Sequence, residues 1–124
     1  MKILIVDDEP GLAVGLANLL KENGFEQARA AASGTGADHV IKELGGIDVL
    51  VTDVIMEGED GFALSERLTA QDPNLKTVFI SGYDLSDYTD RIGTAPLIQK
   101  PIDGDNLGAV LKQLAIPVAA TPTP

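Results

Sequence analysis

Cysteine is absent from the 124 residues of this chain, which excludes disulfide bonds, thiolate metal sites and cysteine nucleophiles. Histidine occurs once, as His39, which is expected on the exposed face of a helix, so a catalytic or phosphate-carrying histidine is not expected. No apolar run approaches the roughly 20 residues of a membrane-spanning helix, and the amino terminus does not show a cleavable signal pattern. These absences predict a cytoplasmic protein.

Basic side chains are also scarce, with nine Lys and Arg against nineteen Asp and Glu. The formal net charge of −10 disfavours direct binding to nucleic acid or to an anionic membrane. The hydrophobic content of 44% is sufficient for one domain with a sizeable core. We expect that domain over residues 1–116. Residues 117–124 are rich in proline and have nothing to pack, so they are expected to be a disordered tail or the stump of a linker.

Apolar runs alternate with helical repeats along the chain. Strands are predicted at residues 2–6, 28–32, 47–52, 76–80 and 96–99, and helices at residues 10–23, 33–44, 60–71, 82–92 and 104–115. Pro10, Ser33 and Asp60 mark helix starts, since proline suits the first helical position and Ser or Asp can cap a helix. The alternation predicts an α/β fold, a doubly wound five-stranded parallel sheet with helices on both faces.

Polar side chains follow four of the five predicted strands: Asp7 and Asp8, then Asp53, Ser81 and Lys100. Because ligands bind at the carboxyl ends of the strands in such sheets, we expect these side chains to share one crevice. Close carboxylates repel one another and demand a cation, and oxygen ligands without His or Cys favour Mg²⁺. A lysine and a hydroxyl suit phosphate oxygens, and an aspartate can attack phosphorus. The pattern predicts a magnesium-dependent phosphoryl-accepting site.

Each of these residues also has an ordinary explanation when it is taken alone. Asp7 or Asp8 could cap a helix, Ser81 could be a turn residue, and Lys100 could be solvated. A common site is favoured only because these residues occur together, at the ends of four different predicted strands.

Four segments in this order and spacing resemble the receiver domain of two-component response regulators, along the chain up to about residue 115. They are Val6-Asp7-Asp8-Glu9-Pro10, Asp53 with Asp60-Gly61, Phe79-Ile80-Ser81-Gly82-Tyr83 and Gln99-Lys100-Pro101. The resemblance implies the flavodoxin-like strand order 2-1-3-4-5, which is also that of chemotaxis receivers.

The resemblance also implies roles at the metal and the acceptor. Asp53 matches the phosphoacceptor, Asp8 the direct Mg²⁺ ligand, and Asp7 the acid that holds the metal through water. Ile55 matches the residue that lends its backbone carbonyl to the metal.

Two further residues match the groups that bind the phosphoryl group. Ser81 corresponds to the hydroxyl and Lys100 to the amine. Lys100-Pro101 matches a peptide bond that is cis in most of the family, which would aim the lysine inward.

As a receiver, the chain is expected to take a phosphoryl group from a sensor histidine kinase or a histidine phosphotransfer protein. It would catalyse only its own phosphorylation and dephosphorylation, and would switch partner binding through the fourth helix, fifth strand and fifth helix. The donor docks on the first helix in this family. There we expect Leu12, Leu16, Leu19 and Leu20 inside and Ala13, Val14 and Ala17 exposed, although alanine is also simply a good helix former.

Departures from the family pattern leave open how the signal is transmitted. Leu97 replaces the aromatic residue that usually turns inward on activation, and Tyr83 could take over that role by moving with its loop. Glu57 replaces a usual proline, and with Glu59 and Asp60 it would add negative charge beside the site.

Two other functions are compatible with parts of this pattern. One is a pseudo-receiver that binds proteins without being phosphorylated. The other is a magnesium-dependent phosphatase with an aspartyl nucleophile, although Asp7-Asp8-Glu9 is not the Asp-x-Asp motif of such enzymes and the chain has no room for a substrate-covering cap.

Overall fold

The computed structural model describes residues 1–93, 95–100 and 104–115. The Lys100–Pro101 peptide bond and the tail over residues 117–124 lie outside these residues, so the predictions made for them stay predictions. Within the described residues, no helix has the length and apolar character needed to span a membrane.

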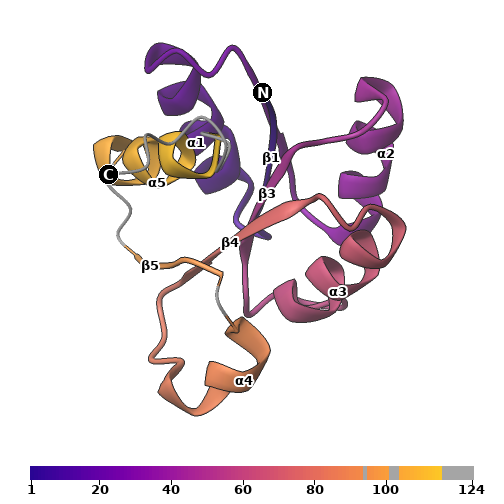
Figure 1. The fold of residues 1–124 in the computed structure, drawn as a ribbon, viewed down its shortest axis with the longest axis vertical. Coiled ribbons are helices and arrows are strands. Elements are labelled where there is room, and N and C mark those ends of the chain that lie inside the picture. The colour runs from indigo at the N-terminus through magenta and orange to yellow at the C-terminus, as the bar shows by residue number, and fades with distance from the viewer. Residues whose placement is uncertain (94, 101–103, 116–124) are drawn as a thin grey trace, which may run out of the picture.

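The described residues form one parallel sheet flanked by helices (Figure 1). The strands are β1 (Lys2–Val6), β2 (Gln27–Ala31), β3 (Val49–Asp53), β4 (Lys76–Ser81) and β5 (Leu97–Gln99). The helices are α1 (Pro10–Glu22), α2 (Gly34–Leu44), α3 (Gly61–Gln71), α4 (Thr89–Ile92) and α5 (Gly104–Ala115), with a 3-10 turn η1 (Ser86–Tyr88) before α4. The strand order β2-β1-β3-β4-β5 confirms the predicted doubly wound α/β fold.

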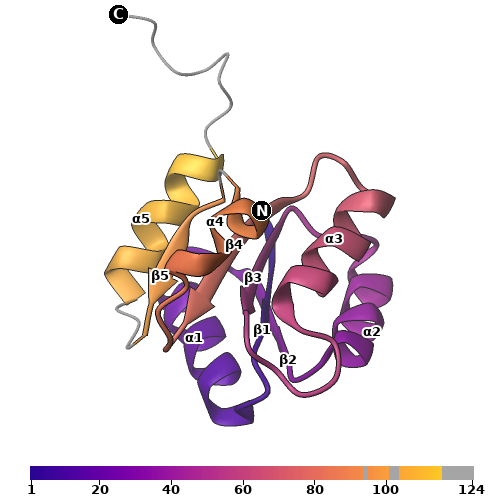
Figure 2. The same ribbon diagram turned by 90° about the horizontal axis from the view of Figure 1, so that it is seen from below.

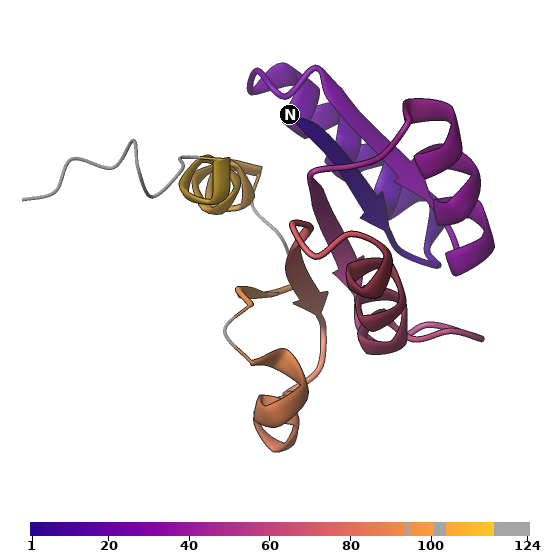
Figure 3. The ribbon, with the colours of Figure 1, turned by 45° about the vertical axis from the view of Figure 1, so that its right-hand side comes forward.

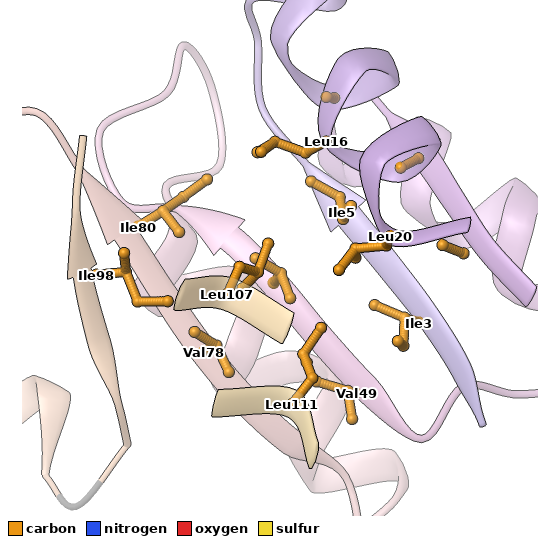
Figure 4. Close-up of a cluster of buried hydrophobic side chains, with 14 residues drawn as sticks. Ile3, Ile5, Leu16, Leu20, Val49, Val78, Ile80, Ile98, Leu107 and Leu111 are labelled. Carbon is orange, nitrogen blue, oxygen red and sulfur yellow. The ribbon is translucent and has the colours of Figure 1, made fainter. Parts of the chain in front are cut away.

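Helices cover both faces of the sheet (Figure 2). Side chains of α1 and α5 pack with β1, β3 and β4 in one buried cluster, in which Leu16, Leu20, Leu107 and Leu111 meet the strands (Figure 4). On the opposite face, α2 and α3 pack against β1 and β3 in a second cluster. Because both faces are covered, β3 is buried at every position, and β1 is buried after its first residue.

Helix starts follow the predicted capping chemistry. Pro10 stands at the first turn of α1. Ser33 Oγ accepts the Gly36 amide at the start of α2, and Asp60 Oδ1 accepts the Ala63 amide at 2.8 Å at the start of α3. The Asp60 cap matters for the site, because it fixes where the loop after β3 ends.

The predicted inner face of α1 is wrong in part. Ala13 and Ala17 are buried, at 1% and 4% exposure, whereas Leu19 is 39% exposed. Close packing explains the difference, since α1 lies against β2 and α5 and the small alanines let it approach the sheet. Of the three residues expected outside, only Val14 is exposed, at 52%.

The segment after β4 is less helical than expected. The polar stretch predicted as one helix over residues 82–92 is a turn, η1 and the four-residue α4. Figures 1 and 3 show α4 set apart from the other helices. A third cluster joins this segment to the body: Phe62 and Phe79 pack edge to face, Tyr88 of η1 lies 5.9 Å from the Phe62 ring, and Arg91 of α4 lies over the same ring at 4.8 Å.

The burial of α1 makes a stability prediction. Ala17→Asp would bury an unpaired carboxylate and should lower the free energy of unfolding by about 3 kcal/mol or more, whereas Val14→Asp at an exposed position should change it by less than about 1 kcal/mol. Urea unfolding of both variants measures this. Equal destabilisation by the two substitutions would contradict the observed face of α1.

Candidate functional site

Three carboxylates meet where β1 and β3 end. The two strands are neighbours and pair Val6 with Thr52, so the next residues, Asp7 and Asp53, emerge side by side. Asp7, Asp8 and Asp53 each offer an oxygen atom, and these atoms lie within 4.8 Å of one another. Asp7 is fully buried, Asp53 is 6% exposed and Asp8 is exposed. The topology therefore brings together acids that lie 46 residues apart in the sequence.

Lys100 enters this cluster from the end of β5. Its Nζ lies 2.8 Å from Asp7 Oδ2 and 3.5 Å from Asp53 Oδ2, and its amide donates to the Ser81 carbonyl at 2.8 Å. Burial alone would lower the pKa of Lys100, but the contact with Asp7 and the charges of Asp53 and Asp7 outweigh burial and raise it. Lys100 is thus held as a cation between the two buried acids.

Asp53 is the titratable group in the cluster whose ionised form is disfavoured. Burial is the largest cause, the charge of Asp7 adds to it, and Lys100 opposes both, with the result that the pKa of Asp53 is raised. An additional cation beside Asp53 would reverse this effect and favour the carboxylate that a nucleophile needs.

The donor set fits a hard divalent cation such as Mg²⁺. All three side chains offer oxygen, and three carboxylates face one ammonium group. Asp7 Oδ1 accepts the Glu9 amide at 2.9 Å, but the buried Asp7 Oδ2 accepts no hydrogen bond from the described residues and has only the Lys100 ion pair there. A buried oxygen with spare acceptor capacity in a carboxylate cluster is suited to hold water or a metal ion.

A crevice of about 680 Å³ opens over the acids. Asp8, Asp53 and Lys100 line it together with Ile55, which is 49% exposed, and Tyr83, which is 64% exposed. The structure therefore places Ile55 in the wall of the crevice, next to two of the predicted metal ligands. The volume of the crevice is sufficient for a phosphoryl group.

Ser81 occupies the end of β4 but is fully buried. Its Oγ accepts the Tyr83 amide at 3.0 Å and donates to the Tyr83 carbonyl at 3.4 Å. The hydroxyl is thus engaged with its own loop. Its strand neighbours put it next to the site, because Ile80 pairs with Asp53, and Ser81 itself pairs with Gln99.

The acids after Asp53 do not all add charge to the crevice. Glu57 lines it, and its amide donates to Asp8 Oδ2 at 3.2 Å. Glu59 instead pairs with Arg67, and Asp60 caps α3. The expectation of three additional charges beside the site is therefore too large.

Arg67 was not singled out by the sequence. It lies eight residues after Glu59, beyond the three- or four-residue spacing at which helical neighbours meet, so no local pattern points to the pair.

Leu97 is the first residue of β5, an edge strand of the sheet, and is 39% exposed. It lines a second pocket of about 380 Å³, and Tyr83 belongs to the walls of both this pocket and the acidic crevice. Tyr83 therefore stands between the site and the surface around Leu97.

The raised pKa of Asp53 predicts how stability depends on pH. A carboxyl whose pKa is higher in the folded state binds its proton more tightly there, so ionisation destabilises the metal-free fold as pH rises through that pKa. Asp53→Asn should thus stabilise the metal-free protein more at pH 8 than at pH 4. Urea unfolding in chelator, with Asp87→Asn as an exposed control, measures the difference. A gain that shrinks as pH rises would contradict this.

A family model, described as the response regulator receiver domain, matches residues 3–112. Sporulation initiation phosphotransferase F of Bacillus subtilis is 28% identical over 115 residues, which cover 90% of this chain and 91% of that protein. Sensor kinase CckA of Brucella abortus is 38% identical over 82 residues, but these span 65% of this chain and only 9% of the kinase.

Solved structures show the same likeness. A response regulator receiver protein from Sinorhizobium medicae has a TM-score of 0.80 at 28% identity, with 92% of this chain and 93% of that chain covered. The response regulator TrrA from Thermotoga maritima, solved in complex with Mg²⁺ and BeF, has a TM-score of 0.78 at 26% identity, with 92% and 99% covered. Receivers are phosphoacceptor signalling modules rather than conventional enzymes. With its fold, its acidic cluster and a family match over most of its length, this chain belongs to the response regulator receiver domains.

Proposed function

We propose that this receiver takes a phosphoryl group onto Asp53 from the phosphohistidine of a sensor histidine kinase or a histidine phosphotransfer protein, with Mg²⁺. The observation that carries the proposal is the cluster of Asp7, Asp8 and Asp53 with Lys100 reaching between them. The complex of the similar TrrA with Mg²⁺ and BeF supports it.

The chemistry assigned to Asp53 is a single displacement. A carboxylate oxygen of Asp53 attacks the phosphorus atom, the new P–O bond forms as the P–N bond to the donor histidine breaks, and the electron pair stays on the imidazole nitrogen. Lys100, 3.5 Å from Asp53 Oδ2, supplies positive charge for the transferred oxygens. Asp7, Asp8, Asp53 and the carbonyl of Ile55 would hold Mg²⁺, which supplies charge neutralisation when bound.

Donor docking is assigned to the outward face of α1. Gly11, Val14 and Gly15 are exposed at helical spacing, and α1 begins three residues after Asp7. This face replaces the Ala13 and Ala17 surface expected from the sequence. The small residues would let a helical donor approach closely.

The output of the switch is assigned to the face formed by α4, β5 and α5. Ser81 Oγ would turn from Tyr83 to an oxygen of the phosphoryl group, and one hydroxyl proton cannot serve both acceptors. Release of the Tyr83 carbonyl would free the loop, and the pocket beside Leu97 offers room for the Tyr83 side chain. Two populations of this face would then bind different partners.

A cytoplasmic location stays a prediction.

The phosphoacceptor role is tested with Mg²⁺ and a small donor such as acetyl phosphate, followed by intact-mass measurement. We expect one phosphoryl adduct on the wild type, at least about tenfold less of it without Mg²⁺, and none on Asp53→Ala. A protein that neither gains the adduct nor hydrolyses the donor would be a pseudo-receiver, and turnover without an adduct would indicate a phosphatase. An adduct that persists in Asp53→Ala would move the acceptor to another residue.

The role of Tyr83 is tested by NMR of the phosphorylated protein. Tyr83→Ala should leave the adduct yield within about twofold, because the Ser81 contacts are to the Tyr83 backbone and remain. It should reduce the phosphorylation-dependent shift changes at Leu97 and Ile98, because the side chain that would move into the pocket beside Leu97 is removed. Tyr88→Ala, a tyrosine that packs on Phe62 instead, is the matched control. Unchanged shifts at β5 in Tyr83→Ala would exclude this route.

A further inference from the structure

The loop between β3 and α3 carries two groups that act at the acidic site. Ile55 lies in the wall of the crevice, and the Glu57 amide donates to Asp8 Oδ2 at 3.2 Å. The position of this loop, and how well its conformation is fixed, therefore determine the shape of one side of the proposed metal site.

The ends of the loop are held by backbone contacts. The Gly61 amide donates to the Val54 carbonyl at 2.9 Å, and a Cβ at Gly61 would overlap the Asp53 carbonyl, so glycine allows the close return of the chain. Met56 is buried against the cluster under α2 and α3. Glu57 and Gly58 are exposed, and between them and α3 stands Glu59.

Arg67, on the second turn of α3, binds both carboxylate oxygens of Glu59 through Nε and Nη2. Nε lies 2.8 Å from Glu59 Oε2 and Nη2 lies 2.9 Å from Glu59 Oε1, while Nη1 lies 2.8 Å from Asp38 Oδ1 on α2. The forked pair is directional and resists rotation of the carboxylate. The hydrogen bonds to Glu59 and then to Asp38 raise the pKa of Arg67 further above its usual range.

The Glu59 carboxylate also packs against the first turn of α2. A Cβ at Gly34 would overlap Glu59 Oε1, and Gly34 is buried although it starts a helix. The Glu59 side chain is 27% exposed and that of Arg67 is 34% exposed, so the pair is partly shielded from water. Glu59 thus contacts Arg67 on α3 and Gly34 on α2, and Arg67 in turn binds Asp38 on α2. These contacts join the loop to two helices that lie side by side on one face of the sheet (Figure 2).

We propose that Arg67 is a positioning residue for the metal site, which acts by clamping Glu59 so that the loop holds Ile55 and the Glu57 amide in place at the acidic crevice. The proposal rests on the proposed function for the use of Mg²⁺. Arg67 itself lines neither the crevice nor the pocket beside Leu97, so its effect passes through Glu59 and the loop.

Two physical reasons connect the clamp to metal binding. Mg²⁺ requires near-octahedral geometry, so a ligand carbonyl that wanders by a fraction of an ångström binds it less well. A loop that is ordered before the ion arrives loses less conformational entropy on binding. The clamp also has an electrostatic consequence, since it keeps the Glu59 carboxylate paired with Arg67 and away from the crevice.

The test uses substitutions that keep net charge. Arg67→Lys retains the positive charge but cannot form the fork, and Gly34→Ala displaces the Glu59 carboxylate without any change of charge. Arg29→Lys is the matched control. Arg29 on β2 also pairs with a glutamate, Glu43 on α2, but by a single contact of 2.8 Å and far from the loop's Glu59. Each variant is titrated with Mg²⁺ alone and followed by NMR. Exchange of the Glu57 and Gly61 amides is measured in the metal-free protein.

We expect Arg67→Lys to weaken Mg²⁺ binding roughly tenfold and to speed exchange of both amides by a similar factor, as is typical when a group that orients a metal ligand is lost. Gly34→Ala should act in the same direction without a loss of melting temperature, since alanine favours a helix. Arg29→Lys should stay within about twofold of the wild type.

Unchanged amide exchange in Arg67→Lys would overturn the clamp, whether or not the protein binds Mg²⁺. Faster exchange with an unchanged Mg²⁺ affinity would overturn the link to the metal site, and an equal loss of affinity in Arg29→Lys would do the same. A wild type that binds no Mg²⁺ and forms no phosphoryl adduct would overturn the proposed function together with the positioning role. The exchange data would still show whether the Glu59 contact orders the loop.

Discussion

The repulsion between Asp7 and Asp53 at the ends of two neighbouring buried strands is the constraint on which the rest of the site depends. Both carboxylates are almost completely removed from water, and like charges in such a place are costly unless a cation joins them. Lys100 meets part of this need, with its shorter contact to Asp7. The negative charge that remains on the carboxylates favours binding of a divalent cation. It also makes the ionisation of Asp53 depend on whether that cation is bound.

The surroundings of the site differ in how firmly they are held. On the β3 side, the return of the chain at Gly61, the Asp60 cap and the Glu59–Arg67 fork tie the loop to α2 and α3. On the β4 side, the chain passes through the Ser81–Tyr83 contacts into a turn and a helix of four residues. A rigid side suits metal binding, and a side with few contacts suits a change of conformation.

The exposed Leu97 changes where a conformational signal could pass. An aromatic side chain that swings inward at this position is not available, yet a pocket lies between Leu97 and Tyr83, and Tyr83 also borders the acidic crevice. Below it, Phe62, Phe79 and Tyr88 connect α3, β4 and η1 in a separate aromatic cluster. Tyr83 contacts Ser81 through its backbone and borders both the acidic crevice and the pocket beside Leu97.

Local periodicity in the sequence predicted the five strands and four of the five helices, and it failed only for the polar stretch 82–92, which is a turn, η1 and a short α4. The caps at Ser33 and Asp60, the parallel sheet and the acids at the strand ends were also predicted, because parallel strands end at one edge of the sheet. Tertiary structure alone decided which face of α1 is buried and that Glu59 turns away from the crevice to Arg67. Those outcomes depend on how closely a helix approaches its neighbours and on contacts between residues that no regular helix or strand repeat brings together. Such contacts exist only after the sheet has brought distant segments together.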